Sequence, residues 1–132
     1  MLWSAYGNGK DSKMTVSILG TEYEIIKKKY ADDHDFERSD IDGYCDTHSK
    51  TIVHCDMTTY PGWQTEPPAT IRRNEQNTLR HEIIHAFLAE SGLAENSLKL
   101  NAGWATNEEM VDWFALQGGK IHEAWKAAGA ID

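Results

Sequence analysis

The spacing of apolar positions changes about halfway along this chain of 132 residues. The first half carries short runs that are rich in β-branched side chains, which favour strands. Residues 15–19 (TVSIL) and 22–28 (EYEIIKK), joined by a Gly-Thr pair, predict one hairpin, and residues 43–46 and 51–57 predict a second. The acidic and polar residues 30–42 between the two hairpins are expected to form a loop.

In the second half, apolar residues recur at the spacing of a helix. Leu79, Ile83 and Phe87 follow one another at intervals of four residues, which places them on one helical face. The pair Ser91-Gly92 has the character of a helix C-terminus. These features predict a helix over residues 72–91.

A second helix is predicted over residues 106–118, after a largely polar linker at 96–105. The pair Gly118-Gly119 is expected to end or bend this helix, because glycine is a poor helix former. Residues 121–128 then predict a last short helix.

The order of the elements, strands first and helices afterwards, predicts an α+β fold. We expect the helices to pack on one face of a small antiparallel sheet. The length allows one domain with one modest core. We therefore expect a loose N-terminal leader over residues 1–13 and a single domain over residues 14–132.

Composition narrows the function classes. The formal net charge is −8, which argues against binding to nucleic acid, because a nucleic-acid binder needs a basic face. The sequence contains no run of 18 apolar residues and no apolar stretch behind basic residues at its start, so we expect no membrane span and a cytoplasmic protein. Cys45 and Cys55 fit that compartment; their role is open between buried thiols and part of a second metal site.

The clearest chemical signal is His81-Glu82-Ile83-Ile84-His85, an H-E-x-x-H motif inside the first predicted helix. Residues at positions i and i+4 lie on one helical face, so the imidazoles of His81 and His85 can converge on a single ion. Nitrogen ligands of this kind suit Zn²⁺. Glu82 lies one position after His81 and can accept a proton from water without binding the metal. The motif therefore predicts a zinc site with a glutamate general base.

A third ligand is available in the second predicted helix. Glu108 is followed one turn later by Asp112, and if Glu108 binds the metal, Asp112 can accept the free N–H of a ligating imidazole, most plausibly that of His81. Glu109 is the alternative ligand. Thr106 and Glu109, however, fit a capping box that would give Glu109 a structural role at the helix N-terminus. We therefore expect Glu108 to bind the metal.

At these residues the sequence resembles a gluzincin, a class of zinc metallopeptidases. The HEIIH segment is similar to the active-site helix of that class, and NEEMVDWF is similar to the Asn-Glu-x-x-x-Asp-x-Phe segment of thermolysin-like peptidases. The overall resemblance is to the small ImmA/IrrE-like metallopeptidases of bacteria, phages and mobile elements. Those proteins also carry an Asp-Gly-x-x segment in a hairpin, and Asp42-Gly43-Tyr44-Cys45 is similar to it.

This resemblance covers about residues 41–118 and implies a minimal zincin-like fold that hydrolyses peptide bonds. We expect one Zn²⁺ ion, a protein or peptide substrate and a monomer. A strand of the hairpin that includes residues 51–57 is expected to form an edge along which an extended peptide could pair. Two further residues, Tyr60 and His122, are candidates for stabilising the oxyanion of the transition state.

The main alternative is a non-catalytic protein in which zinc stabilises a small core or the zincin fold serves as an interaction scaffold. The motif distinguishes the two hypotheses. A structural site usually has four protein ligands and needs no general base. Here only three ligands are apparent, and Glu82 is placed for proton transfer, which favours the catalytic interpretation.

Overall fold

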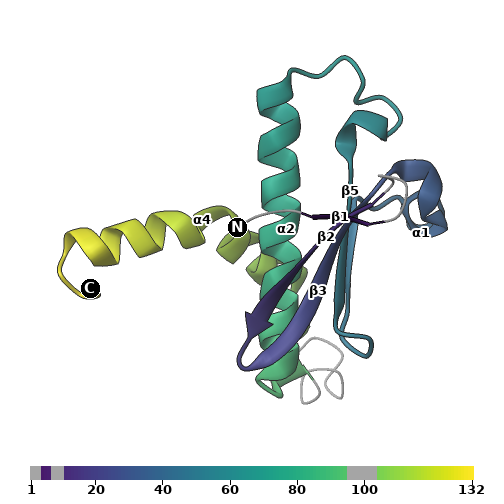
Figure 1. The fold of residues 1–132 in the computed structure, drawn as a ribbon. Helices are drawn as coiled ribbons and strands as arrows, with labels where there is room; N and C mark the ends of the chain where they lie inside the picture. The colour runs from purple at the N-terminus through teal and green to yellow at the C-terminus, as the bar shows by residue number, and fades with distance from the viewer. Residues whose placement is uncertain (1–3, 7–10, 95–103) are drawn as a thin grey trace.

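The computed structural model describes residues 4–6, 11–94 and 104–132, which form an α+β fold, as the sequence predicts (Figure 1). A five-stranded sheet makes one layer, and the long helix α2 lies across it and contacts β2, β4 and β5. The elements in chain order are β1 (Ser4–Tyr6), β2 (Asp11–Ile18), β3 (Thr21–Lys28), η1 (Tyr30–Asp32), α1 (His34–Ser39), β4 (Gly43–Asp46), β5 (Thr51–Cys55), η2 (Met57–Thr59), α2 (Pro68–Glu90), η3 (Trp104–Thr106) and α4 (Glu108–Ala127).

The sheet is mixed, so the prediction of an antiparallel sheet is wrong in one respect. Its strand order is β1-β2-β3-β5-β4, and β5 runs parallel to β3, with Ile25 opposite Ile52, whereas the other neighbouring strands are antiparallel. Both predicted hairpins are present as β2–β3 and β4–β5. The prediction of two separate hairpins did not include a parallel pair of strands between them. In the structure β5 joins β3 and β4 is left at the edge.

Residues 30–42, expected to be a loop, contain the short helices η1 and α1. The side chain of Asp33 accepts a hydrogen bond from the backbone N–H of Asp35 and thereby caps α1. Phe36, in the middle of α1, is fully buried and packs with Val53 and Met57. The many acids of this segment conceal the apolar side chains that anchor it, which are Phe36 and, packed against the same cluster, Tyr30 and Ile41, and this explains the incorrect prediction.

The expectation of a loose leader over residues 1–13 is also corrected where the structure describes that stretch. Strand β2 begins at Asp11, three residues before the predicted domain start, and β1 pairs with it through Ser4 and Lys13. The polar and small residues of this segment give no strand pattern, so its pairing depends on the neighbouring edge of the sheet.

Helix α2 covers one face of the sheet and contacts it with the apolar side of the helix. Leu79 and Ile83 pack against a buried cluster that includes Ile18, Tyr23 and Ile52. The helix begins at Pro68, four residues before the predicted start. Proline suits this position because the N–H groups of the first helical turn have no acceptor within the helix, so the N–H that proline lacks is not needed. The other face of the sheet is covered by the cluster around Phe36.

Helix α4 runs without a break from Glu108 to Ala127, through Gly118 and Gly119. The helix therefore does not end at these glycines, and the predicted helix 121–128 is the continuation of α4. In Figure 1 the second half of α4 projects away from the rest of the molecule. Of the predicted linker 96–105, only Trp104 and Ala105 lie within the described residues. In the part of the chain that the structure describes, no helix is both long and apolar enough to cross a membrane.

Candidate metal centre

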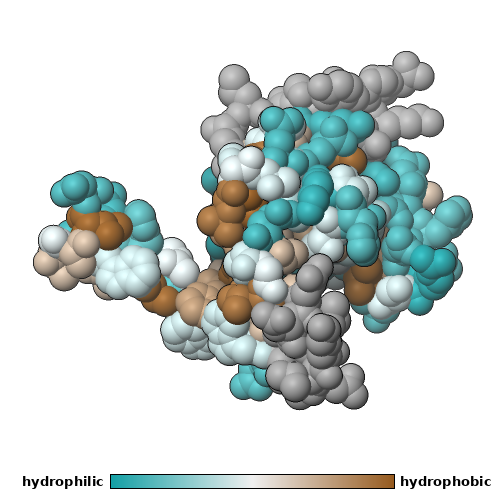
Figure 2. Space-filling model, turned by 90° about the horizontal axis from the view of Figure 1, so that it is seen from below, coloured by the Kyte–Doolittle hydropathy of each residue, from teal (hydrophilic) through white to brown (hydrophobic). Residues whose placement is uncertain are grey.

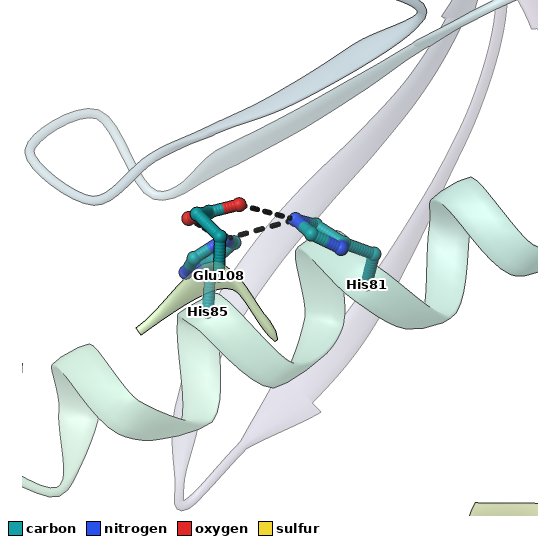
Figure 3. Close-up of side chains that lie close together, drawn as sticks. All are labelled: His81, His85 and Glu108. Carbon is teal, nitrogen blue, oxygen red and sulfur yellow. Dashed lines mark hydrogen bonds and ion pairs between the residues drawn. The ribbon is translucent and has the colours of Figure 1, made fainter. Parts of the chain in front are cut away.

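The two histidines of the H-E-x-x-H motif lie on one side of α2 and point toward each other (Figure 3). Their Nε2 atoms are 3.1 Å apart. Two nitrogens that bind one tetrahedral zinc ion at 2.0–2.1 Å lie about 3.3 Å apart, so the spacing of His81 and His85 fits a shared ion.

Glu108, the first residue of α4, brings a carboxylate to the same point. Its Oε2 is 3.1 Å from His81 Nε2 and its Oε1 is 3.0 Å from His85 Nε2. One donor atom from each of the three side chains lies within 4.8 Å of the others, and the group could hold a metal ion. Two imidazole nitrogens and one carboxylate form a donor set that zinc accepts.

The start of α4 fixes which acid reaches this point. The N-cap is Asn107, whose side chain accepts a hydrogen bond from the N–H of Met110. The predicted capping box with Thr106 as N-cap is therefore wrong. The alternative ligand Glu109 is not part of the three-residue group, which contains Glu108.

Asp112 lies one turn after Glu108, beside the outer side of the His81 ring. Its Oδ1 is 2.7 Å from His81 Nδ1, as the sequence predicts. When His81 donates its Nδ1–H to this carboxylate, Nε2 carries the free lone pair and faces the other two donors. Asp112 therefore fixes both the tautomer and the orientation of the imidazole.

Glu82 is buried beside the three donor groups, and 7 % of its surface is exposed. Its Oε1 is 3.8 Å from His81 Nε2. Burial raises the pKa of the Glu82 carboxyl to about 7, and the carboxylates of Glu108 and Asp42 act in the same direction, while His81 opposes them. Burial also lowers the pKa of His85, which favours the neutral ring that a metal requires.

These side chains line an open cavity of about 850 Å³ that lies between α2 and β4. The expectation of a pairing edge is corrected for residues 51–55, because β5 is paired on both sides, with β3 and with β4. Strand β4 is the outer strand on this side of the sheet, and its residues Gly43, Tyr44 and Cys45 line the cavity.

Asp42, immediately before β4, ties this edge strand to α2. Its Oδ2 accepts hydrogen bonds from Asn74 Nδ2 at 3.0 Å and from Thr78 Oγ1 at 3.1 Å. Thr78 lies three residues before His81. The next residue, Gly43, comes so close to the helix that an added Cβ would lie 2.6 Å from Thr78 Cγ2. The Asp-Gly pair thus lets β4 approach the helix that carries the histidines.

Arg80 was not singled out by the sequence, but it helps to place Glu108. Its Nε donates a hydrogen bond of 2.6 Å to the carbonyl oxygen of Ala115, which joins α2 to α4. Val111 and Ala115 are both fully buried at this contact. A lone arginine beside the motif gives no sequence signal for such a backbone contact.

The remaining candidates from the sequence are separated by the fold. Tyr60 lines the cavity, and its hydroxyl donates to Asp40 at 3.0 Å. His122 lies in the exposed second half of α4. Cys45 and Cys55 are free thiols, and neither belongs to the metal group found among the described residues. Burial raises the pKa of both thiols, to about 12.

Comparisons with known proteins supply no further identification. None of the family models, curated proteins and solved structures compared with this chain matches it.

Proposed function

We propose that this chain is a zinc-dependent metallopeptidase with a minimal zincin-like fold. The observation that carries the proposal is the meeting of Glu108, from a separate helix, with His81 and His85 of the H-E-x-x-H motif. Zinc bound there acts as a Lewis acid that activates water and polarises a carbonyl group. The three protein donors leave room for water or substrate as a fourth ligand.

Glu82 is the proposed general base. It is buried beside the donor group and lines the same cavity, so it can accept a proton from the attacking water and later return it to the leaving amine. Asp112 holds the His81 ring in the required tautomer. This division of roles follows the resemblance to gluzincins and is consistent with the positions of the side chains.

The cavity suits an extended peptide. Its α2 wall runs from Asn74 to Ala89, which is about 22 Å of helix at 1.5 Å per residue. About seven residues of a strand have this length. We propose that a peptide pairs with the outer edge of β4 and passes over the metal centre, as in β-strand addition.

The first test is metal content by elemental analysis of the wild type and of the Glu108→Gln variant. We expect about one zinc per chain in the wild type and a large loss in Glu108→Gln. Glu109→Gln is the matched control, because it removes a neighbouring acid that lies outside the group. If no metal binds even after zinc is supplied, the proposal is wrong at its foundation.

The second test separates catalysis from zinc binding. We expect Glu82→Gln to keep zinc and to lose peptide cleavage by about 10²–10⁴-fold, the usual contribution of a general base. A peptide library incubated with the zinc-loaded wild type supplies the substrates. If zinc binds and neither form cuts any peptide, the non-catalytic zinc protein becomes the better interpretation.

A further inference from the structure

An apolar groove of about 410 Å³ lies between α2 and α4, on a different side of α2 from the metal group. Its walls include Ile84 and Phe87 of α2, Met110 and Phe114 of α4, and Trp104. Phe87 is 41 % exposed and Phe114 is 39 % exposed. Apolar side chains left open to this degree in one continuous groove are typical of an interaction site.

The second half of α4 carries an apolar stripe that continues from this groove. Ile121 and Trp125 follow Phe114 by seven and eleven residues, so all three lie on nearly the same side of the helix. No residue of α4 after Ala115 is buried, and Trp125 is 53 % exposed. Figure 2 shows apolar surface, in brown, both on the projecting arm and where the arm joins the body.

The spacing of residues along α4 would allow a second copy of the chain to pair with this surface in an antiparallel alignment. Gly118 and Gly119 also line the groove, and the exposed stripe follows them along α4. A Cβ at either position would meet nothing within 4 Å, which leaves room for a helix to cross closely. Trp125 lies six residues after Gly119, and position 112 lies six residues before Gly118. An antiparallel crossing at the glycines therefore places Trp125 of one copy between Met110 and Phe114 of the other.

The charges of α4 favour the same antiparallel arrangement. The first turns of the helix carry three acids, at Glu108, Glu109 and Asp112, and the later part carries Lys120 and Lys126 with a single acid, Glu123. Antiparallel pairing brings the basic part of each helix near the acidic part of the other, and it also opposes the two helix dipoles.

We propose that two copies of this chain associate through α4 about a twofold axis at Gly118–Gly119, with each Trp125 in the apolar groove of the other copy. The contact is isologous, so every favourable interaction occurs twice. None of the residues that line the groove is a proposed metal ligand. The monomer expected from the sequence would then be in equilibrium with the dimer. Because this face contains a modest number of side chains, we expect a dissociation constant on the order of micromolar.

Sedimentation velocity across a concentration series tests the association. We expect the wild type to shift from monomer to dimer, and Trp125→Ala to weaken the dimer by at least roughly tenfold, as for a central aromatic anchor. Leu116→Ala is the matched control: Leu116 is 55 % exposed on the same helix but does not line the groove. A wild type that stays monomeric at about 100 μM, or a Trp125→Ala variant that dimerises as well as the wild type, would overturn the proposal.

Disulfide trapping tests the register. Gly118→Cys places a thiol at the proposed axis and on the same side of α4 as Phe114 and Trp125, and oxidation should link two copies, because the Cα atoms there can approach within disulfide range. Lys126→Cys is the control, since its two copies would be about 22 Å apart along the antiparallel helices. Wild-type protein measures any linkage through Cys45 or Cys55. Efficient linkage of Lys126→Cys with none at Gly118→Cys would rule out this crossing.

Discussion

The two halves of α4 belong to one continuous helix but differ in how the fold supports them. In the first half, Val111 and Ala115 are buried against neighbouring elements, and Arg80 binds the carbonyl of Ala115. In the second half, which begins at Leu116, no residue is buried. The supported half carries Glu108 and Asp112, which must be held within a few tenths of an ångström to serve a metal. The unsupported half carries the proposed association surface, which can be completed by a second copy.

The largest difference between the two halves of α4 is expected in metal affinity, when Asp112 is substituted. Asp112→Asn weakens the hydrogen bond that the carboxylate accepts from the Nδ1–H of His81. Loss of such a partner typically lowers metal affinity by about 10–100-fold. Competition with a chromogenic chelator measures the change. His122→Asn, a substitution in the unsupported half of α4, is expected to leave the affinity unchanged. An equal loss in both variants would mean that α4 as a whole, and not the contact of Asp112 with His81, sets the affinity.

A smaller effect is expected from the packing of α4 itself. Val111→Ala removes two methyl groups from a fully buried site and should lower the free energy of unfolding by about 1–3 kcal/mol. Leu116→Ala removes more apolar volume from an exposed site and should change it by less than about 0.5 kcal/mol. Urea unfolding of the metal-free variants, at concentrations below the proposed association, gives both numbers. Equal losses would contradict the division of α4 into two halves.

The metal group was predictable because it depends on helical spacing. His81 and His85 share a face at any position in a helix, and Asp112 follows Glu108 by one turn, so local geometry fixes each pair. The meeting of the two pairs was expected from the acids of the second helix and from the resemblance, and the structure brings the pairs together through Val111, Ala115 and Arg80. Zinc binding and catalysis stay predictions.

The parts that the sequence did not predict depend on tertiary contacts. The choice of β5 over β4 as the neighbour of β3 was not predicted, although β5 (TIVHC) is more apolar and more deeply buried than β4 (GYCD). Helix α1 depends on the burial of Phe36. The glycines at 118 and 119 have a low helix propensity, and α4 nevertheless continues through them, so their usual effect as helix breakers misled the prediction.

The smallest predicted effect concerns the end of α2. Side chains of the sheet and of its turns contact this end, whereas among the described residues the end of α4 has no such support. Glu90, the last residue of α2, accepts hydrogen bonds from Lys50 Nζ at 2.6 Å, Tyr23 Oη at 2.7 Å and Thr21 Oγ1 at 3.0 Å. The Lys50 and Tyr23 contacts hold the pKa of the Glu90 carboxyl below its ordinary value of 4.5. A carboxyl whose pKa is lower in the folded state contributes stability above its unfolded pKa. That stability is lost as the pH falls through the folded value.

We therefore expect the difference in unfolding free energy between wild type and Glu90→Gln to be largest near neutral pH and to shrink below about pH 4.5. Because Glu90 is accessible to solvent on part of its surface, the effect should be modest and should decrease with added salt. Glu123→Gln, in the unsupported half of α4, is the control and should show no such dependence on pH. Urea unfolding at several pH values checks both variants. A difference for Glu90→Gln that stays constant from neutral to acidic pH would mean that the contacts at the end of α2 depend on shape rather than on the charge of the carboxylate.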